Sequence, residues 1–397
     1  MKRGSLLAAL FLAALTLRPQ LVGVGPLLPS IQSDLGVSHA VAGLLGTIPV
    51  LCMGLFAPPA PYLVARAGSR AAVAAAVLAV GVFGVVRALV PSAAGVVLAT
   101  VPVGVGMGFA GAMLPVAVKE RFADRPGFAT GVYTAGMTIG SAVGAAAAVP
   151  LAHLGNGWRT PLLVFGAVSV VLGATWIVLT RAEPPHVRLD TRPLRLPFRN
   201  PLAWRLVAAF FFMSSVFYGL NSWLPDAYVE RGWSQSSAGA LLAILNTLTI
   251  PVGFAVAWIA DHRGQRRTWL AGAAVLQLGA LVGVVTAPSA GWLWAAVLGI
   301  AIGPLFPLTM TLPLDATDRP AEVASLAGMM LGVGYTLSAA SPLVLGAIRD
   351  LTGGFSAVLW TLAAAAAALV LVDASFSPER LGAARSSAGR PPRAASS

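Results

Sequence analysis

The chain has 397 residues, of which 57% are hydrophobic and only 10% are charged. Soluble globular proteins carry about 25% charged residues, so this composition excludes a water-soluble fold and indicates a membrane protein. The net charge of +12 would also suit a nucleic-acid-binding protein, but the distribution of the charges described below excludes that class.

Apolar segments of about 20 residues, the length that crosses a bilayer as a helix, recur along the whole chain. We predict an all-α membrane protein with about twelve spans, because a segment in lipid must satisfy its backbone hydrogen bonds internally. In chain order the predicted spans are 5–28, 40–64, 71–90, 93–118, 127–151, 160–180, 204–225, 236–260, 269–287, 291–313, 323–348 and 355–374.

Lysine and arginine gather in alternate loops between these spans. With the N-terminus in the cytoplasm, 21 of the 26 face the cytoplasm and Arg18 lies in the membrane. By the positive-inside rule, this predicts a multi-pass protein of the cell (bacterial inner) membrane with both termini cytoplasmic and no nucleic-acid partner. Arg87, about one turn from the outer end of its span, is expected to extend to the lipid interface. The four residues on the outer side are Arg87, Arg159, Arg231 and Arg349.

The two halves of the chain repeat one pattern at a spacing of 196 residues. A repeat of this kind indicates that each half is a copy of one six-helix unit. The matching residues include Leu28-Pro29 with Leu224-Pro225, Gly36 with Gly232, Ser38 with Ser234, and Arg70 with Arg266.

The repeat and the composition together predict the domain organisation. Two pseudo-symmetric six-helix halves occupy 1–181 and 204–378. A cytoplasmic linker rich in Pro and Arg, 182–203, joins them, and a disordered cytoplasmic tail, 379–397, follows. Paired halves of this kind place a substrate site near the bilayer midplane, at the seam between them.

The loop after the second span of each half carries a recognisable motif. Residues 61–70 read PYLVARAGSR and residues 257–267 read AWIADHRGQRR. Both are similar to the Gly-x-Leu-x-Asp-Arg-x-Gly-Arg-Arg loop of the major facilitator superfamily, which the chain resembles over essentially its whole length. The resemblance implies the major facilitator fold and a gating charge latch between helix ends. The matching residues are Arg66, Arg70, Asp261 and Arg266, while Ala65 replaces the acid of the first copy.

Shorter motifs resemble one branch of this superfamily, the cyanate and 2-nitroimidazole permeases. The resemblance implies a carrier of cyanate-like anions or small nitroheterocycles. Leu331 stands where that branch is expected to have a glutamine, so the exact substrate does not follow from the resemblance. The motifs include Leu17-Arg18-Pro19, Ile48-Pro49-Val50, Trp223-Leu224-Pro225 and Ser341-Pro342.

Arg18 lies in the middle of the first predicted span, about two turns from either end. An arginine at a helix centre costs roughly 2.5–3.5 kcal/mol on insertion scales, and no acidic residue nearby in sequence neutralises it. The alternatives are a bond to a helix carbonyl, extension to the interface, or a role in binding a negative or oxygen-rich solute. Its depth favours the last, so we predict that Arg18 binds the substrate.

The repeat places Ser214, on the seventh span, opposite Arg18. Ser214, Tyr218 and Asn221 share one helix face because they are spaced i, i+4 and i+7. We predict Tyr218 and Asn221 as substrate-binding residues, with hydrogen bonding between helices as the alternative for both and as the preferred role of Ser214.

Three further residues are predicted to line the same site. Tyr133 and Tyr335 are expected at equivalent positions of the two halves, where their rings either form walls of the pocket or pack in the core. Asn246 is a polar residue in the middle of the eighth span, and it is the third predicted substrate-binding residue.

The types of residue that the spans lack also bear on function. No Asp or Glu falls near the centre of a predicted span, and the four histidines lie in loops, so an ordinary intramembrane proton relay is not expected. We find no motif for catalysis, a metal or a cofactor. The predicted function is a monomeric secondary carrier that moves a small anion or small polar solute by alternating access. The alternatives are an efflux carrier of small toxic organic compounds and a membrane sensor without flux.

Overall fold

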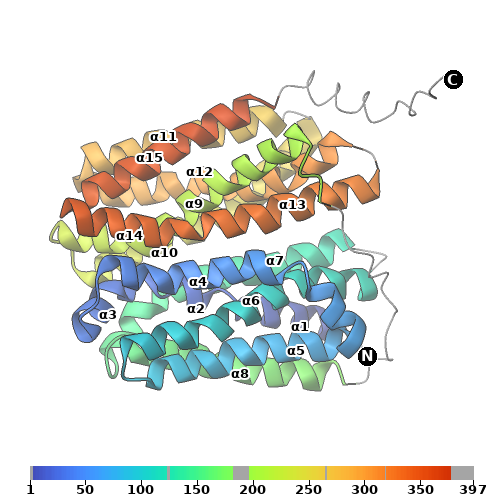
Figure 1. Cartoon of the computed structure of the whole chain (residues 1–397), viewed down its shortest axis with the longest axis horizontal. Coiled ribbons are helices and arrows are strands. Elements are labelled where there is room, and N and C mark those ends of the chain that lie inside the picture. The colour runs from blue at the N-terminus through green and yellow to red at the C-terminus, as the bar shows by residue number, and fades with distance from the viewer. Residues whose placement is uncertain (1–2, 123–125, 182–195, 264–265, 318, 377–397) are drawn as a thin grey trace.

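The computed structural model describes residues 3–122, 126–181, 196–263, 266–317 and 319–376, which form helices joined by short turns (Figure 1). The helices of the first half are α1 (Arg3–Leu15), α2 (Pro19–Val22), η1 (Gly25–Leu27), α3 (Leu28–Leu35), α4 (His39–Phe56), α5 (Ala60–Leu89), α6 (Ala93–Arg121), α7 (Pro126–His153) and α8 (Arg159–Leu179). Those of the second half are α9 (Pro201–Glu230), α10 (Gln235–Arg263), α11 (Arg266–Thr286), η2 (Pro288–Ala290), α12 (Gly291–Ala316), α13 (Pro320–Ser338), α14 (Ala340–Thr352) and α15 (Phe355–Ala374).

The two halves form two bundles that lie against each other along a seam. Figure 1 shows α1–α8, in blue to green, on one side and α9–α15, in yellow-green to red, on the other. The long helices run roughly parallel, and α1 begins at the same end of the molecule at which α15 ends. We call this the terminal end and the opposite end, near α3 and the end of α14, the distal end.

Twelve stretches of helix within the described residues are long and apolar enough to cross a membrane, which confirms the predicted all-α architecture with about twelve spans. The first span differs from its prediction. It extends to Leu35 and consists of α1, α2, η1 and α3 instead of one continuous helix. Proline and glycine cause the interruptions, since Pro19 and Pro26 begin the new turns and neither has an N–H to continue the preceding helix.

Equivalent residues end and begin helices in the two halves. Gly36 and Gly232, which are 196 residues apart, both have positive φ, of 61° and 88°, and each ends the first span of its half. Only glycine adopts this conformation without strain. Ser38 then caps α4, because its hydroxyl accepts a hydrogen bond from the Val41 N–H at 3.3 Å.

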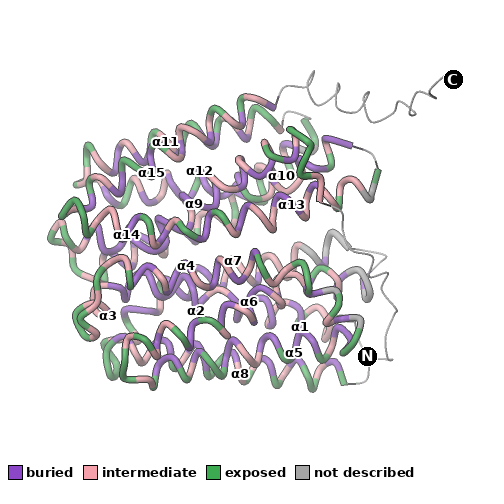
Figure 2. The backbone as a smooth tube through the Cα atoms, in the orientation of Figure 1, coloured by how far each residue is buried: buried purple, intermediate pink, exposed green. Residues whose placement is uncertain are grey.

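The apolar core crosses the seam. One cluster of buried side chains contains both Leu10 of α1 and Phe210 of α9, and a second contains both Leu28 of α3 and Trp223 of α9. In Figure 2 the buried residues lie on the helix faces that meet neighbouring helices, while exposed residues gather on the outer helices. The polar residues near the seam are therefore surrounded by packed apolar side chains.

The predicted linker and tail fall largely outside this description. Of the linker 182–203, residues 182–195 lie outside the described residues, and α9 begins at Pro201. The tail 379–397 lies outside them entirely. The bounds of the four predicted segments therefore stay predictions.

Candidate functional site

A break in the first span positions Arg18. α1 ends at Leu15 and α2 begins at Pro19, so Arg18 is the residue that precedes a new helix. It is half-buried and lies near the middle of the span Gly4–Leu35. The interruption therefore presents a permanent cation within the part of the molecule that lies in the membrane.

The guanidinium of Arg18 meets the opposite half across the seam. Its Nη1 donates a hydrogen bond to the hydroxyl of Tyr218, on α9, at 3.0 Å. The ring of Tyr335, on α13, lies 6.4 Å from the Tyr218 ring, and its phenol is close enough to interact with the guanidinium. No Asp or Glu of the described residues forms an ion pair with Arg18. A guanidinium has five N–H donors, and the bond to the Tyr218 hydroxyl uses one of them.

Asn221 and Asn246 are joined to each other. Both are buried, and the amide nitrogen of Asn246 donates to the side-chain oxygen of Asn221 at 3.0 Å, which links α10 to α9. Each amide also donates to a carbonyl one turn earlier in its own helix, Phe217 and Leu242 respectively. The pair therefore forms the interhelical bond considered as the alternative for Asn221, one turn from Tyr218.

Tyr133 and Ser214 differ in how far they are buried. Tyr133 lies on α7, where it is partly buried against the same apolar cluster that contains Tyr218 and Tyr335. Ser214 is buried on α9, one turn before Tyr218. The structure thus brings Arg18, Tyr218 and Tyr335 into one group, with the Asn221–Asn246 pair next to it.

Arg87 does not extend to the interface, which corrects the prediction. Its side chain is 0% exposed, and its Nη2 donates to both the backbone oxygen (2.9 Å) and the side-chain oxygen of Gln20. Gln20 in turn donates to the Leu162 carbonyl on α8 at 3.2 Å. A polar partner on α2 therefore keeps this arginine inside the protein, next to the break that carries Arg18.

At the terminal end, an arginine of each half caps the last helix of that half, and the arginine of the second half is Arg267, one residue after the repeat partner of Arg70. Arg70 donates to the carbonyls of Ile177 and Arg181 at the end of α8, at 3.0 and 3.2 Å. Arg267 donates to the carbonyl of Ala374 at the end of α15, at 2.7 Å. Both the donors and the acceptors Ile177 and Ala374 are 197 residues apart, so the same contact occurs in both halves. A cation is favourable at a helix C-terminus because of the helix dipole.

The other predicted gating residues are placed as follows. Arg266 forms an ion pair with Asp315, at the end of α12, at 2.8 Å. Sequence reasoning did not single out Asp315. Arg66 is exposed, and the side chain of Asp261 lies outside those that the structure describes.

The distal end of the seam carries polar contacts that sequence reasoning missed. The Gln235 amide, on α10, donates to the Pro26 carbonyl at 2.8 Å and to the Ser30 hydroxyl at 2.9 Å. The Gln32 amide donates to Asp226 at 3.3 Å. Asp226 lies in the last turn of α9 and is only 7% exposed.

Glycines let the two halves approach closely at this end. A Cβ on Gly25 would lie 1.8 Å from the backbone oxygen of Asn221. A Cβ on Gly43 would lie 2.6 Å from the Pro342 carbonyl, and one on Gly46 would lie 2.8 Å from the Ser222 hydroxyl. The distal end is therefore closed by backbone contacts at Gly25 and Gly43 and by a side-chain contact at Gly46.

Comparison with known proteins agrees with this architecture. The sequence pattern of the Major Facilitator Superfamily matches residues 6–339. A solved structure of a bacterial homologue of the human lysosomal transporter Spinster, in an inward-facing and occupied conformation, superposes with a TM-score of 0.76 at 20% identity. The match covers 98% of this chain and 99% of that one.

Two curated relatives from Escherichia coli (strain K12) match nearly the full length. The cyanate transport protein CynX is 32% identical over 94% of this chain and 98% of its own length. The 2-nitroimidazole transporter is 30% identical over 90% of this chain and 91% of its own.

Proposed function

The chain belongs to the major facilitator superfamily and is a multi-pass membrane transporter, and from this premise we propose that it carries a small anion or small, strongly dipolar solute. In this proposal the solute binds at Arg18 and crosses the membrane as the two halves rock around it. Cyanate-like anions are the first candidates.

The charge balance around Arg18 is the observation that carries this proposal. The guanidinium meets the neutral hydroxyl of Tyr218, on the opposite half, and no described carboxylate pairs with it. A cation within a membrane span is normally paired, because an unpaired one is costly there. An anionic solute supplies the missing charge, and the planar fork of arginine suits a group with two acceptor atoms.

The position of Arg18 also supports the proposal. Because its hydrogen bond joins α9 of one half to the broken first span of the other, a solute held by Arg18 and the Tyr218 hydroxyl contacts both halves. Sites at the seam between repeats are typical of such carriers. The names of the two relatives refer to a small anion and to a small polar heterocycle, which suits a compact site.

We propose that the terminal end faces the cytoplasm of a bacterium, with both termini inside. The support is the concentration of Lys and Arg in the loops on that side. The contacts at Gly25, Gly43 and Gly46 then close the outer side of the carrier.

Uptake of labelled cyanate into proteoliposomes tests the proposal. We expect Arg18→Ala to lower uptake roughly tenfold or more, because a hydrogen bond to a charged group contributes about 1.5–3 kcal/mol. Arg18→Lys keeps the charge but loses the fork, so uptake also falls. Arg263→Ala, which removes an exposed arginine from the end of α10, serves as the matched control and retains uptake.

Two results would overturn the proposal. Equal uptake by Arg18→Ala and wild type would remove Arg18 from the mechanism. Binding of cyanate to purified protein without flux in either direction would indicate a sensor instead of a carrier.

A further inference from the structure

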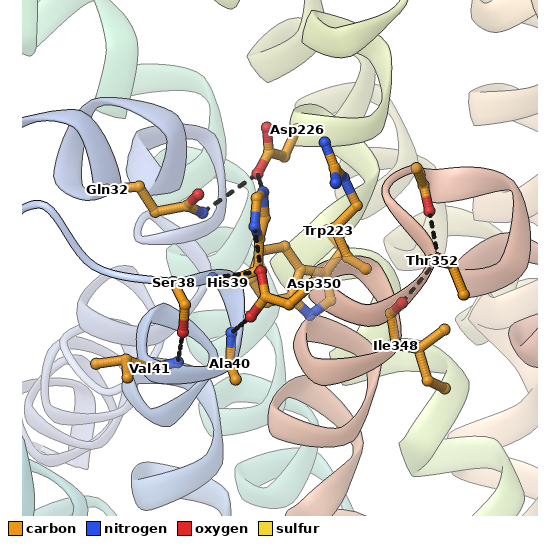
Figure 3. A network of polar contacts seen from close by, with 12 residues as sticks. Gln32, Ser38, His39, Ala40, Val41, Trp223, Asp226, Ile348, Asp350 and Thr352 are labelled. Carbon is orange, nitrogen blue, oxygen red and sulfur yellow. Dashed lines mark hydrogen bonds and ion pairs between the residues drawn. The ribbon is translucent and has the colours of Figure 1, made fainter.

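His39 joins the two halves at the distal end, where it lies between two carboxylates of the opposite half (Figure 3). Its Nδ1 lies 2.8 Å from Oδ1 of Asp350, on α14, and its Nε2 lies 3.7 Å from Oδ2 of Asp226, on α9. Every ion pair across the seam among the described residues involves His39.

The backbone of the first half takes part in the same contact. Asp350 accepts hydrogen bonds from the N–H groups of His39 at 3.1 Å and Ala40 at 2.8 Å, at the N-terminus of α4. Both of its oxygens therefore act as acceptors, as in an ionised carboxylate. The Gln32 amide donates to Asp226 in the same way.

This geometry suits the protonated form of His39. A neutral imidazole donates from one nitrogen and presents a lone pair from the other, whereas the cation donates from both. Both ring nitrogens of His39 face carboxylate oxygens, so only the cation is attracted to both. The rings of Trp223 and Phe355, whose centroids are each 5.7 Å from that of the imidazole, pack against it.

The symmetry of the fold supplies an internal comparison. At the spacing of 196 residues, His39 corresponds to Gln235 and Asp226 corresponds to Ser30. The Gln235–Ser30 hydrogen bond crosses the seam at 2.9 Å. In each half, the first residue of the second span therefore bonds to the first span of the opposite half. The Gln235–Ser30 contact is neutral at every pH, whereas the His39–Asp226 contact joins a histidine to a carboxylic acid.

We propose that His39, Asp226 and Asp350 form a proton-binding site, and that a proton bound there holds the distal end of the carrier closed. The other charged groups that face the site are Arg349 of α14 and Glu230 of α9, which pair with each other at 2.6 Å. This pair contributes no net charge, so the charge of His39 decides whether the two facing carboxylates are attracted across the seam.

The direction of the effect follows from linkage. When the halves separate at the distal end, His39 loses contact with both carboxylates. Protonation then favours the closed form, because the attraction exists only there. The closed form therefore gains population as the pH falls, and it loses population as the pH rises.

The proton-binding site does not depend on which solute is carried. It rests on one part of the proposed function, namely that the distal end opens as the halves rock. A solute-free measurement tests it. Spin labels on Leu89→Cys and Leu293→Cys, two exposed residues near the distal ends of α5 and α12, report the distance between the halves. Cys52, the single cysteine, is replaced by alanine in this background.

Wild type in nanodiscs should show the closed-to-open ratio rise roughly three- to tenfold between about pH 8 and about pH 5, since the side chains are partly exposed and the ion pairs are moderate. His39→Gln should lose this dependence. The double variant His39→Gln with Asp226→Ser copies the neutral Gln235–Ser30 contact, so it should close the distal end equally at all pH values. His153→Gln removes another histidine at the distal end, outside this network, and should behave as wild type.

Three results would overturn the inference. The first is a closed-to-open ratio in wild type that does not change with pH, and the second is a pH dependence that persists in both His39 variants. The third is a single distance at every pH, and also when cyanate is added, which would contradict the rocking motion of the proposed function as well.

Discussion

Replacing Gly25 by alanine should disfavour the closed arrangement of the distal end. A Cβ at this position would lie 1.8 Å from the Asn221 backbone oxygen, whereas real Cβ contacts essentially never fall below 3.0 Å. The two halves must therefore separate by at least about 1.2 Å at this point, because a backbone oxygen does not rotate away as a side chain does.

The size of the effect follows from the cost of overpacking. Inserting a methyl group into a packed interior costs typically 1–3 kcal/mol. The three nearest atoms to the added Cβ all belong to the opposite half, so this cost falls on the closed form alone. The open-to-closed ratio should therefore increase roughly 5- to 150-fold.

The spin-label pair at Leu89 and Leu293 measures this ratio at a fixed pH. Gly111→Ala is the matched control, because a Cβ on Gly111 would have no atom within 4 Å. Uptake should fall in Gly25→Ala, since a carrier that closes poorly at one end completes its cycle slowly. A distance distribution identical to that of Gly111→Ala would refute the close approach of η1 to α9.

Three further outcomes are expected. Gln20→Leu should lower the stability measured by thermal unfolding in detergent by about 1–3 kcal/mol, because Arg87 loses its side-chain partner. The double variant Gln20→Leu with Arg87→Met should recover part of this stability, because it removes the unpaired charge. Equal melting temperatures of the single and double variants would contradict this. Arg70→Ala and Arg267→Ala should each lower stability by about 0.3–1 kcal/mol, as expected for equivalent contacts with helix C-termini; a large difference between them would argue against equivalence. Tyr218→Phe should raise the KM for cyanate several-fold without a change in melting temperature, because the hydroxyl that orients the Arg18 guanidinium is lost. An unchanged KM would contradict that role of the hydroxyl.

Much of the architecture was predictable because hydropathy and the repeat both act over long segments. The apolar composition of twelve segments defines the spans, and it does not depend on which helices pack against them. The repeat spacing of 196 residues identified the seventh span as the counterpart of the first. The helical spacing of Ser214, Tyr218 and Asn221 then directed attention to the face on which Tyr218 meets Arg18. Whether these residues bind the substrate stays a prediction.

The errors concern contacts between residues far apart in the chain. Arg87 was expected at the interface because its position near a helix end was visible, whereas its partner Gln20 is 67 residues away. His39 and Asp350, 311 residues apart, each occupy a helix end, where isolated polar residues are common. Only the packing of α4 against α14 brings them together, and no local pattern encodes that pairing.

The glycines at the seam have a consequence for ion leakage. A carrier has to move its solute without ever becoming a continuous aqueous pore. Where Gly43 lets α4 rest directly on the main chain of α14, no long side chain stands between the helices and no layer of water is needed to fill the gap. Such a dry barrier blocks the passage of protons and small cations when the distal end is shut. The membrane therefore keeps its electrochemical gradient while no solute is bound to the protein.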